Sequence, residues 1–284
     1  TKLDYYGIRG TSLDWFTSYL SNRKQFVCIV PQGSILGPLL FLIYINDLHV
    51  AIEHCETYHF ADDTNLQLIS ESLKKLNKHI NHDMANLVQW LRANKIALNS
   101  SKTELVLFGT PNTTFQKKHD ISSPKYLNFR LCGQKIFPSN SIKYLGVTID
   151  KNLSFRTHVN EIRLKLSRAT GMIAKIRHYV NFETLLCIYH AIFGCHLQYA
   201  CQVWGQSSGQ QLSKVVALQN KVMRLMHFQH KHFQTDILYY LSKVLKLNDL
   251  IKYANCLFVW KQKKTFFHLY LETILQIELN VAII

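Results

Sequence analysis

The chain has 284 residues, of which 48% are hydrophobic and 12% aromatic, so it holds enough apolar material for a sizeable core and wholesale disorder is excluded. Lysine and arginine outnumber aspartate and glutamate by 33 to 18, which gives a formal net charge of +15. This excess favours a polyanionic partner, with nucleic acid ahead of an anionic membrane surface, although basic proteins without such a partner are common.

The 7 cysteines are scattered, and none forms a Cys-x-x-Cys pair. This pattern predicts reduced, mostly buried thiols in an intracellular protein, nuclear or cytoplasmic. A zinc site can be imagined at His190, Cys195, His196 and Cys201, but their spacing matches no familiar ligand pattern, and core or surface positions are expected instead. No apolar run reaches the roughly 18–20 residues that a spanning helix needs, so no membrane partner is expected.

The first elements are helical. One helix is predicted to stop at Gly7. A second is predicted to start from an N-cap at Thr11, with the acid Asp14 three residues later, and to end at the turn-like segment 21–24. A short strand over 25–30 then leads into a loop over 31–38, rich in proline and glycine. In this loop Gly33 permits close approach of another molecule and Gln32 can bond to it, but a tight turn into a core helix explains the same residues. The following helix, over 39–48, is apolar nearly all round and is expected to be buried.

Two adjacent aspartates, Asp62 and Asp63, lie between two short apolar runs, which predicts a hairpin with the acidic pair at its tip. Hairpin turns favour glycine or asparagine because they need positive φ, so two acids without a glycine fit poorly. Their mutual repulsion is easier to explain if a cation binds there, and Mg²⁺ typically takes one or two carboxylates together with substrate phosphates. A solvated surface turn is the alternative.

A long amphipathic helix is predicted over 72–93, because apolar residues recur at steps of three and four. Lys102 follows it at the junction between a turn and a strand that ends at Phe108. The segment 110–123 is predicted to be a polar loop, and 127–137 a small hairpin around Gly133. A further strand is predicted over 142–150, bent at Gly146. The apolar face of the long helix is Leu73, Leu76, Ile80, Met84, Leu87 and Leu91.

Beyond Asn152 the pattern is helical throughout, and the helix over 159–176 carries a strongly basic outer face. The predicted fold class is therefore α+β, with a mixed domain over 1–150 followed by an all-α domain over 151–284. Further helices are predicted over 182–199, 212–226, 235–245 and 250–261.

Five motifs follow one another along the chain: GIRG with LDWF and YLSNR over 7–23, VPQGSILGPLLF with NDL over 30–48, FADDT over 60–64, LNSSKT over 98–103 and YLGV over 144–147. Together and in this order they resemble the reverse transcriptase domain of non-LTR (LINE-like) retrotransposons, of the jockey/CR1 type. The resemblance covers nearly the whole chain.

The resemblance implies a polymerase palm with an FADD hairpin and partial fingers, then an all-α thumb and a C-terminal helical segment. It implies RNA-directed DNA polymerase activity by a two-metal mechanism, with Mg²⁺ or Mn²⁺ as cofactor and an RNA template, a DNA primer and dNTPs as partners. The implied roles are metal binding by Asp62 and Asp63, contact of Lys102 with the leaving phosphates, a nucleotide and template pocket at Gln32, Gly33 and Phe60, and a primer grip at Leu145 and Gly146.

In this family a first motif with another metal-binding aspartate precedes the stretch that begins at Gly7, and only six residues precede Gly7 here. We therefore expect an N-terminally truncated piece of a longer protein, with an incomplete metal site and no activity alone. One alternative is a catalytically dead, basic remnant that binds RNA or RNA–DNA hybrid. Another is a decayed product that folds poorly, because the palm sheet would lack a central strand and expose unpaired edges.

Overall fold

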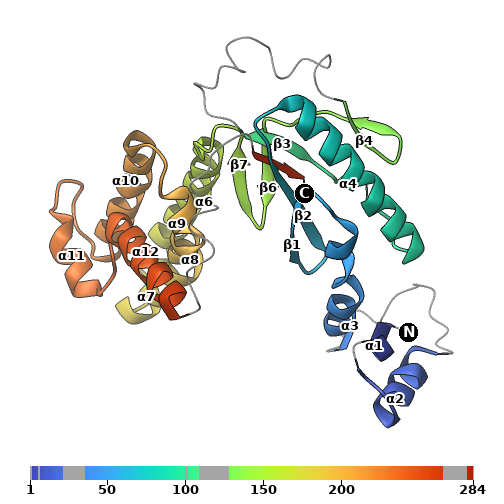
Figure 1. Ribbon diagram of the computed structural model, residues 1–284. Coiled ribbons are helices and arrows are strands. Elements are labelled where there is room, and N and C mark those ends of the chain that lie inside the picture. The colour runs from blue at the N-terminus through green and yellow to red at the C-terminus, as the bar shows by residue number, and fades with distance from the viewer. Residues whose placement is uncertain are drawn as a thin grey trace. The chain divides into compact units, whose positions relative to one another are not determined.

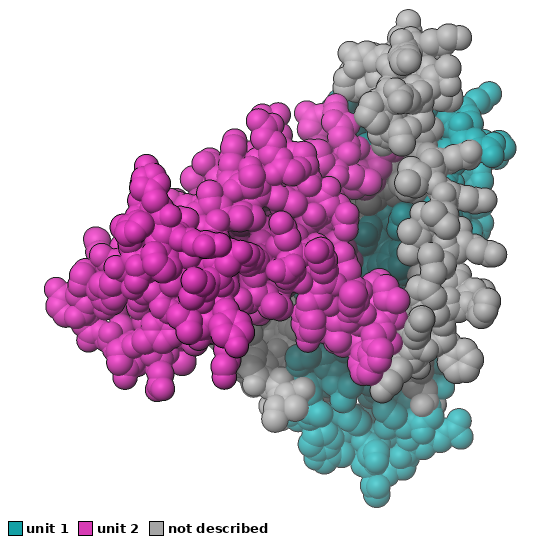
Figure 2. All heavy atoms as spheres, turned by 90° about the vertical axis from the view of Figure 1, so that its left-hand side faces the viewer, with its two compact units in different colours: residues 1–107, 112–138, 278–284 teal, residues 108–111, 139–277 magenta. Residues whose placement is uncertain are grey.

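The computed structural model describes residues 2–5, 7–21, 36–99, 102–108, 128–264 and 280–283 (Figure 1). The chain divides into two compact units, coloured separately in Figure 2. Unit 1 comprises residues 1–107, 112–138 and 278–284, and unit 2 comprises residues 108–111 and 139–277. The predicted mixture of helices and strands is confirmed. The predicted strand over 25–30, the residues Gln32 and Gly33, and the predicted loop over 110–123 lie outside the described residues.

Unit 1 is built around a four-stranded sheet in the order β1-β2-β8-β3. Strands β1 and β2 form an antiparallel hairpin, and β8 pairs antiparallel with the far side of β2. The elements of unit 1 are α1 (Lys2–Tyr5), α2 (Thr11–Leu20), α3 (Leu36–Ile45), the 3-10 helix η1 (Leu48–Ala51), β1 (Glu56–Phe60), β2 (Asp63–Ile69), α4 (Leu73–Ala93), β3 (Leu105–Phe108), the hairpin β4 (Phe129–Leu131) and β5 (Gln134–Ile136), and β8 (Asn280–Ile283).

The core of unit 1 lies between α4 and the sheet. All six residues of the predicted apolar face of α4 are buried, which confirms the helix and its orientation. The sheet meets this face with alternate residues, Leu66 and Leu68 from β2 and Leu105 and Leu107 from β3, because side chains two apart on a strand share one side.

Strand β8 lies between β2 and β3 although it comes from the other end of the chain. Its residues pair with β2 from Leu66↔Ile283 to Ile69↔Asn280. Within the described residues, the gap expected in the centre of this sheet is thus occupied by a strand of the same chain.

Two expectations for the N-terminal helices are wrong. Helix α2 begins at Thr11, and its N-cap is Gly10, which has no side chain to cap the helix. The backbone of Gly10 has a φ of 61°, a conformation that glycine adopts more readily than other residues. Helix α3 is not buried all round: Ile45 is buried, whereas Leu39 and Leu42 are exposed. Only one side of this uniformly apolar helix meets the core of unit 1, so the lack of a polar face did not indicate burial.

Unit 2 is mainly helical, and the predicted helix over 182–199 is an α-helix interrupted by one π-helical segment. The elements are β6 (Ser141–Tyr144), β7 (Val147–Asp150), α6 (Arg156–Ile176), α7 (Phe182–Tyr189), the π-helix η2 (His190–Gly194), α8 (Cys195–Gln198), α9 (Cys201–Trp204), α10 (Gly209–Met226), α11 (Thr235–Ser242) and α12 (Leu247–Lys264).

The segment predicted as one bent strand over 142–150 is instead an antiparallel hairpin of β6 and β7. The chain reverses at Leu145 and Gly146, which have φ of 43° and 78°. Two consecutive residues with positive φ form the kind of tight turn that matches the twist of a hairpin. Val147 and Ile149 of β7 pack into the helical core, so this hairpin belongs with the helices, whereas the predicted division placed it before the boundary at Asp150.

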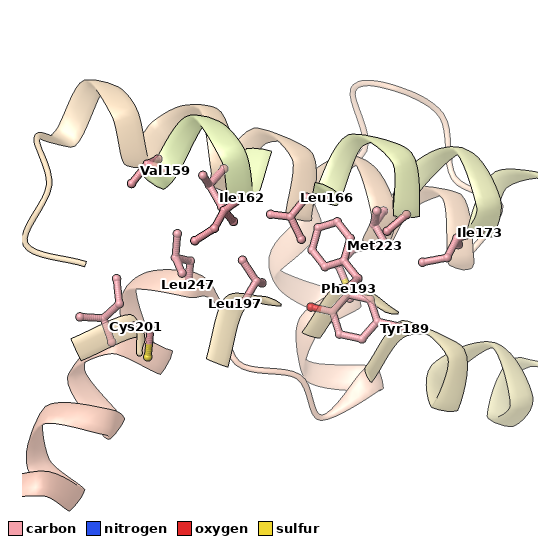
Figure 3. Close-up of a cluster of buried hydrophobic side chains, with 14 of the residues drawn as sticks. Val159, Ile162, Leu166, Ile173, Tyr189, Phe193, Leu197, Cys201, Met223 and Leu247 are labelled. Carbon is pink, nitrogen blue, oxygen red and sulfur yellow. The ribbon is translucent and has the colours of Figure 1, made fainter. Parts of the chain in front are cut away.

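The core of unit 2 is formed by the inner face of α6 against α7, η2, α8 and α10 (Figure 3). The predicted face of α6 is buried from Val159 to Ile173. Tyr189 and Phe193 stack with ring centroids 5.3 Å apart, and burial raises the pKa of Tyr189 to about 12.

The described cysteines are free, as predicted, but the expectation that most are buried is wrong. Cys201 is buried and Cys55 is half-buried, while Cys132, Cys187, Cys195 and Cys256 are exposed. Among the helices of the described residues, none combines the length and the apolar character needed to cross a membrane.

Candidate functional site

The predicted acidic hairpin is present as β1 and β2, with Phe60 opposite Asp63 at the last pair of the ladder. The two turn residues are therefore Ala61 and Asp62, and Asp63 opens β2. Ala61 takes the positive φ, 53°, that a two-residue turn requires, in a position where glycine is usual. A left-handed conformation at a residue with a Cβ is disfavoured by about 1–2 kcal/mol, so the surrounding hairpin holds this turn against local preference.

Both carboxylates of the turn are exposed. Leu66 and Leu68 point from β2 toward α4, so by strand alternation Asp63 lies on the opposite face. Phe60 shares that face because residues directly opposite one another in an antiparallel pair do so, and its side chain is 62% exposed. The tip thus presents the Phe60 ring and the Asp63 carboxylate on the face opposite α4, with the exposed Asp62 beside them in the turn. Within the described ranges, no third His, Cys, Asp or Glu forms a metal-binding group with Asp62 and Asp63.

The face of the hairpin that points toward α4 is less open. His59 pairs with Thr64, and its Nδ1 lies 3.2 Å from the Thr64 hydroxyl. Burial, followed by the nearby charge of His49, lowers the pKa of His59, so the imidazole is neutral near pH 7. The two faces next to the turn therefore differ: one carries negative charge and the other an uncharged, half-buried ring.

Lys102 lies in the turn that leads into β3, and its backbone N–H donates to the carbonyl of Asn99 at 3.1 Å. Its side chain is exposed. Since β3 belongs to the same sheet as β1 and β2, the structure places Lys102 in the same unit as the two aspartates.

Leu145 and Gly146 form the turn of the β6–β7 hairpin in unit 2, and Tyr199 packs against them. The Tyr199 hydroxyl donates to the Leu145 carbonyl at 2.5 Å. A Cβ added to Gly146 would lie 3.3 Å from Cε1 of Tyr199, so ring and turn are in close contact. Sequence reasoning missed Tyr199, because nothing local connects this tyrosine with a turn more than fifty residues earlier.

A basic surface, defined here as Arg163, Lys165, Arg168 and Lys175, lies on α6. Arg163 is partly buried, and the other three are exposed. The opposite face of the same helix is buried in the core of unit 2, so Lys165, Arg168 and Lys175 lie on an exposed basic side as predicted. Arg177, which the prediction also placed on this face, is half-buried and donates to the Leu225 carbonyl at 3.0 Å. Cations spaced along a helix in this way suit contacts with phosphates, which carry little sequence information.

Asp83 is a second residue that sequence reasoning missed. Its carboxylate is fully buried and accepts backbone N–H groups from Glu53 at 3.3 Å, His54 at 2.9 Å and Cys55 at 2.7 Å. Burial and then the hydrogen bond to Asp83 raise the pKa of the Cys55 thiol. The available signal was an acid within the apolar stripe of α4, directly before Met84. This carboxylate fixes the segment that leads into β1 and hence the base of the acidic hairpin.

The sequence model of the family described as reverse transcriptase (RNA-dependent DNA polymerase) matches residues 4–149, which include the acidic hairpin, Lys102 and the Leu145–Gly146 turn. The match extends over more than half of the chain, and the chain belongs to the reverse transcriptase family.

The curated relatives are proteins of mobile elements. The chain is 30% identical over 218 residues to a protein named as a probable RNA-directed DNA polymerase from transposon X-element of Drosophila melanogaster, with 74% of this chain and 23% of that protein covered. It is 28% identical over 245 residues to the RNA-directed DNA polymerase from mobile element jockey of the same species, with 82% and 25% covered. These relatives confirm the predicted resemblance to a LINE-like reverse transcriptase domain.

The chain spans about a quarter of the length of these relatives. No solved structure gives a significant match.

Proposed function

We propose that this chain contributes the acidic hairpin of a retrotransposon RNA-directed DNA polymerase, and that Asp62 and Asp63 bind the divalent metal ions of nucleotidyl transfer. The observation that carries the proposal is the pair of exposed carboxylates at the two-residue turn of β1 and β2, in a chain of the reverse transcriptase family. The donor set fits Mg²⁺ or Mn²⁺, because hard cations take carboxylate oxygens and share the rest of their coordination with substrate phosphates.

When bound, the metal pair lowers the charge on the reacting phosphate and on the pyrophosphate that leaves. Asp62 and Asp63 would hold the pair at the turn through their carboxylate oxygens. Lys102, exposed in the turn that leads into β3, neutralises or protonates the leaving phosphates. Phe60, on the same face as Asp63, packs against the nucleotide.

The remaining predicted residues position the nucleic acid in this proposal. Gln32 and Gly33 shape the nucleotide and template pocket, a role that rests on the family resemblance alone. The Leu145–Gly146 turn, braced by Tyr199, holds the primer end through its backbone. The partners are an RNA template, a DNA primer and dNTPs.

Primer extension on an RNA template with Mg²⁺ or Mn²⁺ tests the proposal. The variant is Asp62→Asn with Asp63→Asn, which keeps shape and removes charge, and the matched control is Glu71→Gln, an exposed acid just after β2. Extension that the double variant lacks and the control retains supports the assignment. Equal extension by all three proteins contradicts it.

A second candidate function is binding of RNA or RNA–DNA hybrid without catalysis, and the basic surface of α6 favours it. We expect the logarithm of the binding constant for the hybrid to fall linearly with the logarithm of the salt concentration. The slope should become shallower by about 0.7–0.9 for each phosphate that the protein no longer touches. Lys165→Gln with Arg168→Gln should weaken binding and reduce the slope, while the Asp62 and Asp63 variants should not. No extension by any protein, with this salt-dependent binding intact, supports the second candidate over the first.

A further inference from the structure

A cluster of metal-ligand side chains lies away from the acidic turn, at the opposite end of β1. Glu53 and His54, which precede β1, meet His82 of α4, and one potential ligand atom from each lies within 4.8 Å of the others. The Nε2 of His82 is 3.1 Å from a carboxylate oxygen of Glu53. All three side chains are exposed, so the cluster is open to an ion from solvent.

The cluster is held in place by a buried residue, although its own side chains are at the surface. Asp83, the neighbour of His82, accepts the backbone N–H groups of Glu53 and His54, with distances of 3.3 and 2.9 Å. Hydrogen bonds to a carboxylate are stronger than those to neutral acceptors. The backbone that carries two members of the cluster is therefore tied directly to the helical turn that carries the third.

The spacing suits one ion of small radius. Zinc binds imidazole nitrogens at about 2.0–2.1 Å and carboxylate oxygens at about 2.0–2.2 Å, which places neighbouring ligands of a tetrahedral site about 3.3–3.5 Å apart. The His82–Glu53 pair is already near this separation at 3.1 Å. The third ligand atom lies within 4.8 Å of the other two, so binding requires the exposed side chains to rotate toward the ion.

A further imidazole lies beside the cluster. His79 is three residues before His82 on α4, a spacing that puts both on one side of the helix. Its ring centroid is 4.0 Å from that of His54, and the His54 and His82 centroids are 5.5 Å apart. Three imidazoles and a carboxylate therefore gather where the segment 53–55 crosses α4.

The ligand types select the class of metal. Imidazole nitrogen suits Zn²⁺, Cu²⁺ and Ni²⁺, whereas Mg²⁺ and Mn²⁺ favour carboxylates, carbonyls and water. The set of two histidines and one glutamate is used by zinc sites that keep a fourth position for water or another ligand. We propose that Glu53, His54 and His82 bind one transition-metal ion, Zn²⁺ foremost, which clamps the segment before β1 to helix α4.

This site is separate from the proposed polymerase metals in residues and in ligand chemistry. Glu56, the first residue of β1, lies two residues after His54, so the ion also fixes the base of the hairpin that carries Asp62 at its other end. Zinc binding can be measured without nucleotidyl transfer, so failure of one proposal is distinguishable from failure of the other.

The test is titration of the metal-free full chain with ZnCl₂ by calorimetry, with CoCl₂ absorption as a second probe because Co²⁺ reports coordination geometry. The variants are His82→Ala and, separately, Glu53→Gln. The control is His232→Ala, an exposed histidine of unit 2. We expect one ion per chain, tetrahedral Co²⁺ absorption, at least tenfold weaker binding in both variants, and unchanged binding in the control.

Hydrogen exchange makes the test independent of how well each variant folds. In the unmodified chain, Zn²⁺ should slow amide exchange over residues 53–60 and leave unit 2 unchanged. Equal zinc affinity in all four proteins would assign binding to other members of the chain's 14 histidines and overturn the proposal. Zinc binding without protection of 53–60, or no binding at micromolar zinc, would overturn it as well.

Discussion

Unit 2 is made from one almost continuous stretch of chain, and its large core is dominated by helices that follow one another in sequence. Unit 1 draws on three separate stretches, and its sheet is completed by residues 280–283. The buried polar side chains of unit 2 are hydroxyls, one amide and one imidazole, whereas unit 1 buries the carboxylate of Asp83 and exposes two further acids at the tip of its hairpin. The comparison predicts that unit 2 is the more independent folding unit, while the residues of the proposed metal site belong to unit 1.

The largest expected effect tests whether unit 2 is the more independent unit. Phe193→Ala removes a fully buried ring that stacks on Tyr189, and we expect a loss of about 3–5 kcal/mol in the free energy of unfolding. Denaturant unfolding, followed by hydrogen exchange in each unit, measures it. The control Tyr240→Ala alters a side chain that is 83% exposed and should change stability by less than about 0.5 kcal/mol. Equal loss of protection in both units would show that they unfold together.

The next effect concerns the buried acid of unit 1. Asp83→Asn replaces a carboxylate oxygen with an NH₂ group, which cannot accept from the backbone N–H groups that face it. We expect the free energy of unfolding to fall by about 1.5–3 kcal/mol. The loss should appear as faster amide exchange over residues 53–55. Asp249→Asn, at an exposed acid of α12, is the matched control. Unchanged stability of Asp83→Asn would mean that the loop does not depend on the charge.

Substitution by alanine at two glycines of unit 2 should change the free energy of unfolding in opposite directions. Gly146→Ala adds a Cβ to a residue whose φ is 78°, and this atom would lie 3.3 Å from Tyr199. We expect the free energy of unfolding to fall by about 1–2 kcal/mol. Gly171→Ala, on α6 with open space around it, should gain about 0.5–1 kcal/mol from helix propensity. Thermal melting of both variants measures the pair. A neutral Gly146→Ala would indicate that the β6–β7 turn relaxes easily.

The smallest effect is a dependence on pH. His158 is buried, its Nδ1 accepts the N–H of Thr148 at 3.2 Å, and burial lowers its pKa despite the nearby charge of Glu161. The unfolded state therefore binds a proton at higher pH than the folded state does. Unit 2 should be fully stable above the ordinary histidine pKa of about 6.5 and lose stability as the pH falls below it.

His158→Asn tests this mechanism, since its side-chain oxygen can accept the same N–H and cannot titrate. The melting temperature of the variant should fall less steeply between about pH 7 and pH 5 than that of the unmodified chain. His232→Asn, at an exposed histidine, should keep the original slope. Parallel slopes for all three proteins would assign the acid sensitivity to other half-buried histidines, such as His227.

Local periodicity predicted much of the fold. The α4 face from Leu73 to Leu91 and the α6 face from Val159 to Ile173 were found because a helix repeats every 3.6 residues, whatever it packs against. The acidic hairpin was found because two alternating runs flank Asp62 and Asp63, although the turn lies one residue earlier than expected. Both aspartates and Lys102 fall in unit 1.

The sequence did not predict contacts between residues that are far apart along the chain. Nothing local distinguishes a bent strand from a hairpin at Leu145 and Gly146, and the difference depends on Tyr199 and the helices behind it. The anchoring of residues 53–55 by Asp83 is equally non-local, because a buried acid is tolerated only where several donors converge. The cluster of Glu53, His54 and His82 depends on the same anchor.

The central position of β8 has a consequence for how the protein is made. The ribosome completes β1, β2, β3 and all the helices of unit 2 before it reaches residues 280–283. Until then β2 and β3 have open edges that can pair with another nascent chain, because contacts of long sequence separation form late. Unit 2 can fold during synthesis, while the sheet that bears the acidic turn is completed only after residues 280–283 have emerged.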